Sequence, residues 1–241
     1  GLIALLWLFL LRPEWVGHLL DLVGALVLLG FVFFAYRSKN NERQAIISIF
    51  LMIWFSLFFF ACLFQCSTSL VLFIERFVNR ALFGWTIPTE AFVSLQPFFV
   101  VALAPFLAYL WRRLKNYEPT APQKIVIGLL FGTVSFACFM LAAMAVSQTH
   151  KAGLMWILVG NVLLAVGELC IAPPTLAAIT QLAPAQLRST LIGAFFMALA
   201  FSSYFASLIA KLTAFQKAHQ PIKTAASYLN TYQSIFYLAL G

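Results

Sequence analysis

Long stretches without charge are the feature that most restricts what this chain can form. No charged residue occurs from Ala45 to Ile74, and residues 154–182 contain a single one, Glu168. A helix that crosses the ~30 Å hydrocarbon core of a bilayer needs about 20 mostly apolar residues. Runs of this length and composition therefore predict helices that cross a membrane.

The amino-acid composition indicates the same class of protein. Only 9% of the 241 residues are charged, 63% are hydrophobic, and the mean hydropathy is +0.96. A soluble domain carries about 25% charged residues because its surface faces water. This chain has too few charges to cover a soluble fold, so we expect an all-α integral membrane protein. Its long apolar runs do not resemble the ~10-residue alternating segments of an outer-membrane barrel.

Hydrophilic breaks divide the chain into two helices followed by six. The first two are a partial span over 1–11 and a span over 19–36. The six are predicted over residues 45–74, 91–111, 125–146, 154–182 and 190–210, and from residue 228 onward. The run over 45–74 would form one helix of about 45 Å at 1.5 Å per residue. Such a helix must tilt or project beyond the bilayer.

Both ends of the chain look cut. The sequence begins with Gly1 rather than Met, and it stops at Gly241 within another apolar run. We therefore interpret the chain as a fragment of a longer protein. It is expected to contain part of a transmembrane hairpin over residues 1–37. A six-helix bundle over residues 44–241, with a truncated last helix, would follow.

The net charge of +8 comes from basic residues in the breaks between spans. The dense breaks RSKNNER (37–43) and WRRLKNYEPTAPQK (111–124) fall on one side if the spans alternate. The positive-inside rule favours placing that side in the cytoplasm. Basic residues here are interpreted as topology signals that meet anionic lipid headgroups. No Lys/Arg block is interleaved with stacking aromatics, so nucleic acid is not an expected partner.

Glu168 is the one acidic residue that lies deep within a span. A charge at mid-bilayer costs about 2.5–3.5 kcal/mol on insertion scales. The carboxyl group is therefore expected to face a polar cavity, where it pairs with a cation or takes up a proton. The alternative is a neutral structural acid that is hydrogen-bonded between helices. No basic residue of this chain lies deep enough in a span to be its partner.

Proline and small polar residues mark other positions within the spans. Pro173 and Pro174 follow Glu168 and are expected to disrupt the helix there. Transporters tolerate broken helices in the membrane where they line binding sites or take part in gating. Gln65 and Ser69 are four residues apart and share a helix face. Cavity lining and interhelical hydrogen bonding explain that pair equally well. Gly128 forms a GxxxG pattern with Gly132, which we interpret as a close helix contact.

The sequence does not predict a metal centre, a cofactor or an enzyme. The four cysteines lie inside apolar runs without ligand spacing, and the three histidines lie in loops. No Ser or Asp is paired with a base inside a span, which argues against an intramembrane hydrolase. These residues are Cys62, Cys66, Cys138, Cys170, His18, His150 and His219.

Several segments resemble, in order, those of the proton-dependent oligopeptide transporters of the major facilitator superfamily. GELCIAPPTLAAITQLAP (167–184) resembles their GELxLSPxGLSxVTKLAP segment. FQCSTSL (64–70) is similar to FEQxGSSL of their seventh helix. IPTEAFVSLQPFFVVALAPFLAYLW (87–111) and IGAFFMALAFSSYFAS (192–207) resemble segments of their eighth and eleventh helices. The resemblance implies a six-helix C-terminal half-bundle, preceded by remains of the hairpin between the two halves.

The resemblance also implies roles for individual residues. Glu168 matches a glutamate that contacts the peptide amino group and exchanges with a lysine of the other half during transport, which implies substrate binding and proton coupling. Gln96 matches a peptide-binding asparagine. Phe195 and Phe196 match a Trp-Phe pair that lines the cavity. Together with Gln65 and Ser69, these are the predicted substrate-binding residues.

The chain also departs from the family pattern. Phe64 stands where the seventh helix usually carries glutamate, and Ala172 and Ser203 replace a serine and an asparagine. Phe195 replaces tryptophan. The first of these changes leaves the proton stoichiometry open, and the others bear on peptide affinity.

The functional hypothesis is proton-coupled symport of di- or tripeptides across the bacterial inner membrane by alternating access. The expected partners are the peptide, protons, membrane lipid and a missing N-terminal six-helix half. The alternative hypothesis is a membrane remnant or scaffold fragment that does not transport.

Overall fold

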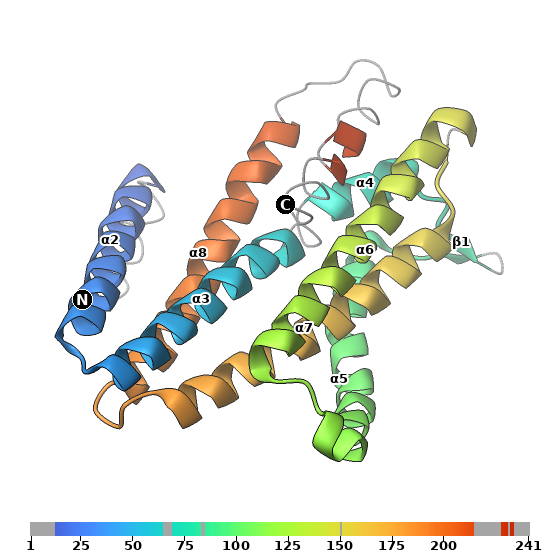
Figure 1. Cartoon of the computed structure of the whole chain (residues 1–241). Coiled ribbons are helices and arrows are strands. Elements are labelled where there is room, and N and C mark those ends of the chain that lie inside the picture. Colours follow the sequence, from blue (N-terminus) through green and yellow to red (C-terminus); the bar gives the residue numbers. More distant parts are fainter. Residues whose placement is uncertain are drawn as a thin grey trace.

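A computed structural model describes residues 13–64, 69–82, 85–149, 151–214, 228–230 and 232–233. The described chain is an all-α bundle in which six helices are long and apolar enough to cross a membrane (Figure 1). The helices are α2 (Pro13–Arg37), α3 (Asn40–Leu63), α4 (Ser69–Phe77), α5 (Thr89–Leu114), α6 (Ala121–Thr149), α7 (Leu154–Leu182) and α8 (Arg188–Ala214). A 3-10 turn, η2 (Lys115–Tyr117), extends α5.

Five of the predicted spans correspond to single helices. The runs 19–36, 91–111, 125–146, 154–182 and 190–210 lie within α2, α5, α6, α7 and α8. The predicted partial span 1–11 lies outside the described residues. Of the run that begins at residue 228, the buried Tyr228 and Tyr232 are described, and both rings pack against Phe73 of α4.

The prediction of one long helix over residues 45–74 is wrong. α3 ends at Leu63, and α4 begins as a separate helix of nine residues at Ser69. Residues 65–68 lie outside the described part. Hydroxyl side chains compete with the helical ladder for backbone hydrogen bonds, and the polar sequence QCST occupies this position. An absence of charge therefore did not guarantee helical continuity.

A short hairpin, which the sequence did not indicate, connects α4 to α5. β1 (Ala81–Leu82) and β2 (Trp85–Thr86) pair antiparallel, with Ala81 opposite Thr86. Just before it, the Ala152 N–H donates to the Phe77 carbonyl at 2.8 Å. Two-residue strands outside the apolar runs leave no periodic signal. This backbone contact joins the end of α4 to the turn between α6 and α7.

α6 and α7 pack closely against each other. A Cβ atom added to Gly128 would lie 2.5 Å from Ile171 Cγ1 and 2.8 Å from the Gly167 carbonyl oxygen. Only glycine permits the two backbones to approach this closely. Gly132 of the same GxxxG pattern faces the Phe59 ring of α3. The structural interpretation of that pattern is therefore confirmed.

Pro173 and Pro174 do not interrupt α7. The helix is continuous from Leu154 to Leu182, with both prolines inside it. Each proline removes one backbone donor, and neighbouring residues maintain the ladder, so the predicted disruption is wrong. α5 likewise continues through Pro97 and Pro105.

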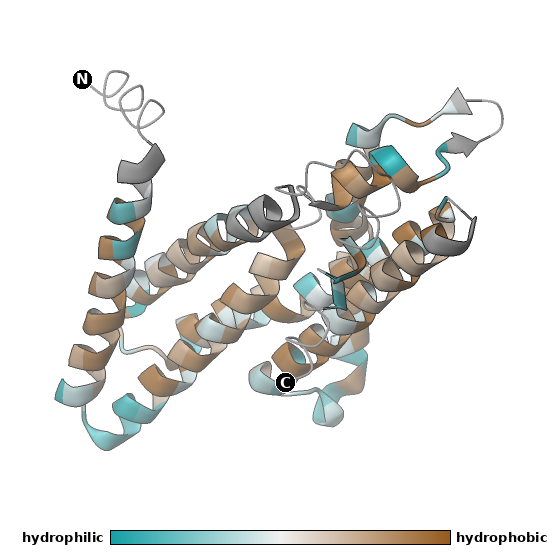
Figure 2. Ribbon diagram, turned by 90° about the horizontal axis from the view of Figure 1, so that it is seen from above, coloured by the Kyte–Doolittle hydropathy of each residue, from teal (hydrophilic) through white to brown (hydrophobic). Residues whose placement is uncertain are grey.

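α2 differs from the other spans because few of its residues are buried. It lies at the edge of the bundle (Figure 1), where its most buried side chain, Phe31, packs against Phe50 of α3. Most of α2 is hydrophobic, and hydrophilic residues gather at its turn into α3 (Figure 2). The predicted division into a hairpin over 1–37 and a bundle over 44–241 remains a proposal.

Candidate functional site

The candidate site is centred on Glu168, near the middle of α7. The neighbouring residue Gly167 faces α6 and α3, because a Cβ there would lie 2.9 Å from the Gly128 carbonyl oxygen and 3.0 Å from Phe59. Successive residues of a helix point about 100° apart. Glu168 is thereby directed away from this tight contact and toward α5.

Gln96 of α5 meets Glu168 from the opposite helix. Its Nε2 donates a hydrogen bond to Glu168 Oε2. Both side chains are partly buried, so the carboxyl group is neither enclosed nor fully exposed. Two residues 72 positions apart, both selected from the sequence as substrate-binding residues, are brought into direct contact.

The chemistry of this pair accommodates both states of the carboxyl group. A carboxylate accepts hydrogen bonds only, whereas a protonated carboxyl also donates one. The glutamine amide carries both an N–H₂ donor and a carbonyl acceptor. Gln96 can therefore satisfy Glu168 with or without its proton, while the remaining carboxyl lone pairs stay open to another donor.

The two predicted phenylalanines face different surroundings. Phe195 is 1% exposed, and its ring packs edge-on against Phe60 of α3 with centroids 6.5 Å apart. Phe196 is 56% exposed. Adjacent residues of a helix point about 100° apart, so the two rings differ in burial, and the expectation that both line one cavity stays a prediction. Phe196 presents its ring at the surface, and Phe195 supports α8 from the core.

Two predicted residues cannot be placed beside Glu168. Gln65 lies outside the described residues. Ser69 is the first residue of α4, and the structure describes its backbone but not its side chain. Phe64 lies directly after α3 and packs against the core with its ring 6.2 Å from Phe60.

A buried hydroxyl pair near the site was not predicted from the sequence. Ser56 of α3 and Thr175 of α7 are fully buried, and their hydroxyl oxygens lie 3.3 Å apart. Each hydroxyl has one proton. It can go to the carbonyl four residues back, Met52 or Ile171 at 2.7 Å, or one hydroxyl can donate across to the other. The sequence feature that could have pointed to this pair is Thr175, a polar residue inside the predicted span directly after Pro174. This pair connects α3 to α7 two turns beyond Glu168.

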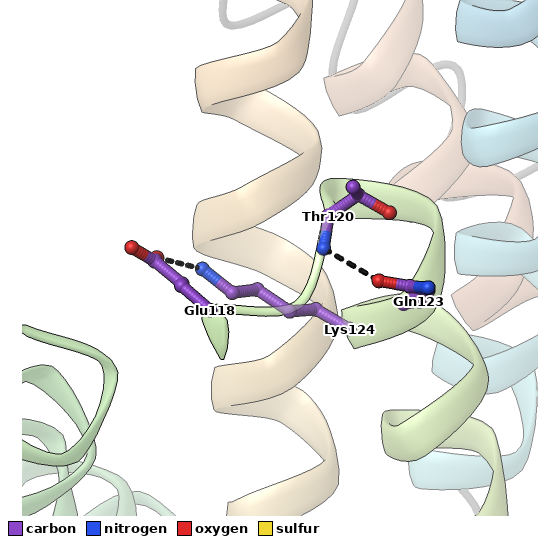
Figure 3. A network of polar contacts seen from close by, with 4 residues as sticks. All are labelled: Glu118, Thr120, Gln123 and Lys124. Carbon is purple, nitrogen blue, oxygen red and sulfur yellow. Dashed lines mark hydrogen bonds and ion pairs between the residues drawn. The ribbon is translucent and has the colours of Figure 1, made fainter. Parts of the chain in front are cut away.

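Lys124, in the first turn of α6, pairs with an acidic residue of the preceding loop. Lys124 Nζ lies 2.5 Å from Glu118 Oε1 (Figure 3). It also lies 5.1 Å from the Trp111 ring centroid. The Thr120 N–H donates to Gln123 Oε1 at 2.8 Å, a capping contact that begins α6. This ion pair joins the α5–α6 loop to the first turn of α6.

The described cysteines do not form a metal site. Cys62, Cys138 and Cys170 are buried free thiols, and Cys66 lies outside the described residues. No group of three or more potential metal ligands occurs among the residues that the structure describes.

Comparison with known proteins extends the resemblance noted in the sequence. The model of the POT family matches residues 18–228. The peptide transporter YePEPT of Yersinia enterocolitica is 33% identical over 206 residues, which cover 83% of this chain and 40% of that protein. Dipeptide and tripeptide permease A of Erwinia pyrifoliae is 29% identical over 230 residues, 92% of this chain and 46% of that protein.

Solved structures give the same result. A mutant of the peptide transporter POT in complex with alafosfalin superposes with a TM-score of 0.78 at 27% identity, covering 99% of this chain and 49% of that one. A POT family transporter in complex with 5-aminolevulinic acid has the same TM-score at 18% identity, which shows the shared fold. The chain thus spans about half the length of the relatives it matches.

These findings confirm the predicted family, fold class and membrane location. Members of this family are transporters rather than enzymes. Six membrane-length helices and the family match identify a multi-pass protein of the inner membrane. Because the family model covers most of its length, the chain belongs to the POT family.

Proposed function

We propose that this chain is the C-terminal half of a bacterial transporter that imports di- or tripeptides together with protons. Its family and the peptide-transporting relatives support peptide as the substrate class. The observation that carries the proposal is the contact between Glu168 and Gln96, which places a carboxyl group with open lone pairs inside a membrane span.

In the proposed binding step, ionised Glu168 accepts hydrogen bonds from the ammonium group of the peptide. Charge-assisted hydrogen bonds of this kind are stronger than neutral ones. Gln96 positions the carboxylate and offers its amide to the peptide backbone. Phe196, exposed on α8, contributes apolar contact area, and Gln65 and Ser69 complete the proposed set.

In the proposed coupling step, Glu168 takes up a proton and loses its attraction for the peptide ammonium group. Gln96 remains able to hydrogen-bond the neutral carboxyl, so release of the peptide leaves no unsatisfied buried group. A lysine from the N-terminal half would compete for the carboxylate. The two halves would rock around this site in alternating access.

The direct test is uptake of a labelled dipeptide into proteoliposomes that contain the full-length protein. We expect accumulation when the outside is acidic relative to the inside, and collapse of that accumulation when a protonophore is added. Uptake that ignores the proton gradient would contradict symport. Absence of peptide binding and uptake would instead favour the alternative of a remnant or scaffold, for which the structure provides no specific observation.

A further inference from the structure

A lateral groove between α2, α3 and α8 lies apart from the Glu168 site. It consists of two adjoining cavities of about 340 and 600 Å³. Val27, Phe31, Ala194 and Met197 border both cavities, so the two lie side by side. Apolar side chains line them almost entirely, and neither is lined by Glu168 or Gln96.

The smaller cavity begins at one membrane face. Its outermost lining residues are Phe34 near the end of α2, Ile46 near the start of α3, and Leu187 just before α8. From Leu187 to Met197, the cavity follows α8 for ten residues, which is about 15 Å. That length is half of a ~30 Å hydrocarbon core, and it matches the depth of one lipid leaflet.

The segments next in sequence to these outermost lining residues are strongly basic. Arg37, Lys39, Arg43 and Arg188 are exposed in the α2–α3 turn and at the start of α8, whereas Glu42 is the one acidic residue among the described residues of these two segments. Arg37 lies 5.9 Å from the Phe33 ring centroid. Within the described chain the four basic side chains form no ion pair. Figure 2 shows this hydrophilic turn beside the hydrophobic length of α2.

We propose that this groove binds an anionic phospholipid. Its phosphate would lie between these basic side chains, and an acyl chain would enter the smaller cavity and extend toward Phe201 in the larger one. Basic pockets between transmembrane helices on the cytoplasmic side suit anionic headgroups. The positive-inside rule places these basic segments on that side. The bound lipid would fill the space that side chains leave open between α2 and α8.

Two glycines make the groove testable without disturbing protein contacts. A Cβ atom added to Gly30 of α2 or Gly193 of α8 meets nothing within 4 Å, and both residues line the smaller cavity. The double variant Gly30→Leu/Gly193→Leu is expected to fill the groove and exclude the acyl chain. Leu29→Phe is the matched control, because Leu29 is 64% exposed on α2 and lines neither cavity.

The experiment is native mass spectrometry of the full-length protein with phosphatidylglycerol and phosphatidylcholine that carry the same acyl chains. We expect preferential retention of phosphatidylglycerol. Arg37→Gln/Arg188→Gln should lower that preference about fivefold for each arginine, given ~1 kcal/mol per basic residue near the lipid surface. Arg112→Gln/Arg113→Gln removes two exposed arginines from the end of α5 and should leave the preference unchanged.

Each outcome decides the proposal. Loss of retention in the glycine variant and loss of preference in the Arg37/Arg188 variant, with both controls unchanged, support it. Equal retention of the two lipids overturns it, as does an equal effect of the Arg112/Arg113 variant. A dimer mass without bound lipid would assign the groove to a second copy of the chain. If the glycine variant fails to fold, the Arg37/Arg188 variant still tests the headgroup site.

Discussion

α7 is used differently on its two sides, and the contrast explains how the bundle can hold a polar site. Toward α6 it presents Gly160 and Gly167, and the backbones approach so closely that an added Cβ would overlap Phe139 or the opposing chain. Toward α5 it presents Glu168, which makes a hydrogen bond through side chains. The first contact fixes the position of α7. The second leaves a carboxyl group free to change partners.

The strongest test of this contrast is Glu168→Gln in the full-length protein. It removes the titratable group but keeps a side chain that can hydrogen-bond Gln96. We expect peptide uptake driven by a proton gradient to be abolished, with membrane insertion unchanged. Uptake into proteoliposomes measured across a pH series checks this. Glu90→Gln, an exposed acid in the first turn of α5, is the control, and wild-type uptake by the Glu168 variant at every pH would refute the role.

The tight side of α7 is tested by Gly128→Ala. The new Cβ would lie 2.8 Å from the backbone oxygen of Gly167, which cannot rotate away as a side chain can. We expect a loss of about 1–3 kcal/mol in the free energy of unfolding, the usual cost of overpacking. Thermal unfolding in detergent measures it.

Gly30→Ala is the matched change at a helical glycine with open space around it. It should be neutral or gain about 0.5–1 kcal/mol. Equal destabilisation by the two substitutions would show that the α6–α7 contact is not the tight one.

The polar side is tested by Gln96→Leu. Loss of a hydrogen bond to a charged group costs about 1.5–3 kcal/mol, and here the loss should fall on function, because the site is partly exposed. We expect peptide affinity to fall about tenfold or more, while thermal stability changes less than in Gly128→Ala. Binding of a labelled dipeptide measures the affinity. Gln96→Asn, which retains an amide, should recover part of it, and unchanged affinity in both variants would remove Gln96 from the site.

The smallest effect is expected at the hydroxyl pair between α3 and α7. Interhelical hydrogen bonds in membranes contribute about 0.6 kcal/mol on average. A double-mutant cycle of Ser56→Ala and Thr175→Val should therefore give a coupling energy near that value. A coupling of several kcal/mol would mean that the contact with α3, rather than that with α6, determines the position of α7.

Much of the architecture was predictable, because membrane helices record their limits in hydropathy and charge. The run 154–182 coincides with α7, and Gly128 was correctly identified as a packing residue. Helix continuity was less predictable. The 45–74 run contains a helix end at Leu63, whereas Pro173 and Pro174 lie inside an unbroken helix. Hydropathy measures solvent preference and does not report local backbone hydrogen bonding.

The candidate site divides in the same way. Glu168 could be selected from the sequence because an isolated carboxyl group in a span is costly anywhere except in a polar setting. Its partner Gln96 was selected by resemblance, since nothing within one helix indicates which side chain of another helix lies opposite. The same limitation explains why Phe195 and Phe196 were predicted together, although only the structure shows that Phe195 is buried against α3.

The sequence by itself determined that this chain crosses a membrane as helices and carries one carboxyl group deep within a span, because transfer of charge into hydrocarbon dominates the energetics of such a chain. Tertiary structure alone decided which helices meet, that Gln96 reaches Glu168, and that an apolar groove remains between α2, α3 and α8. Those features depend on side-chain shape at contacts between segments distant in sequence. Apolar residues of similar hydropathy differ in volume, and close packing in the interior depends on volume.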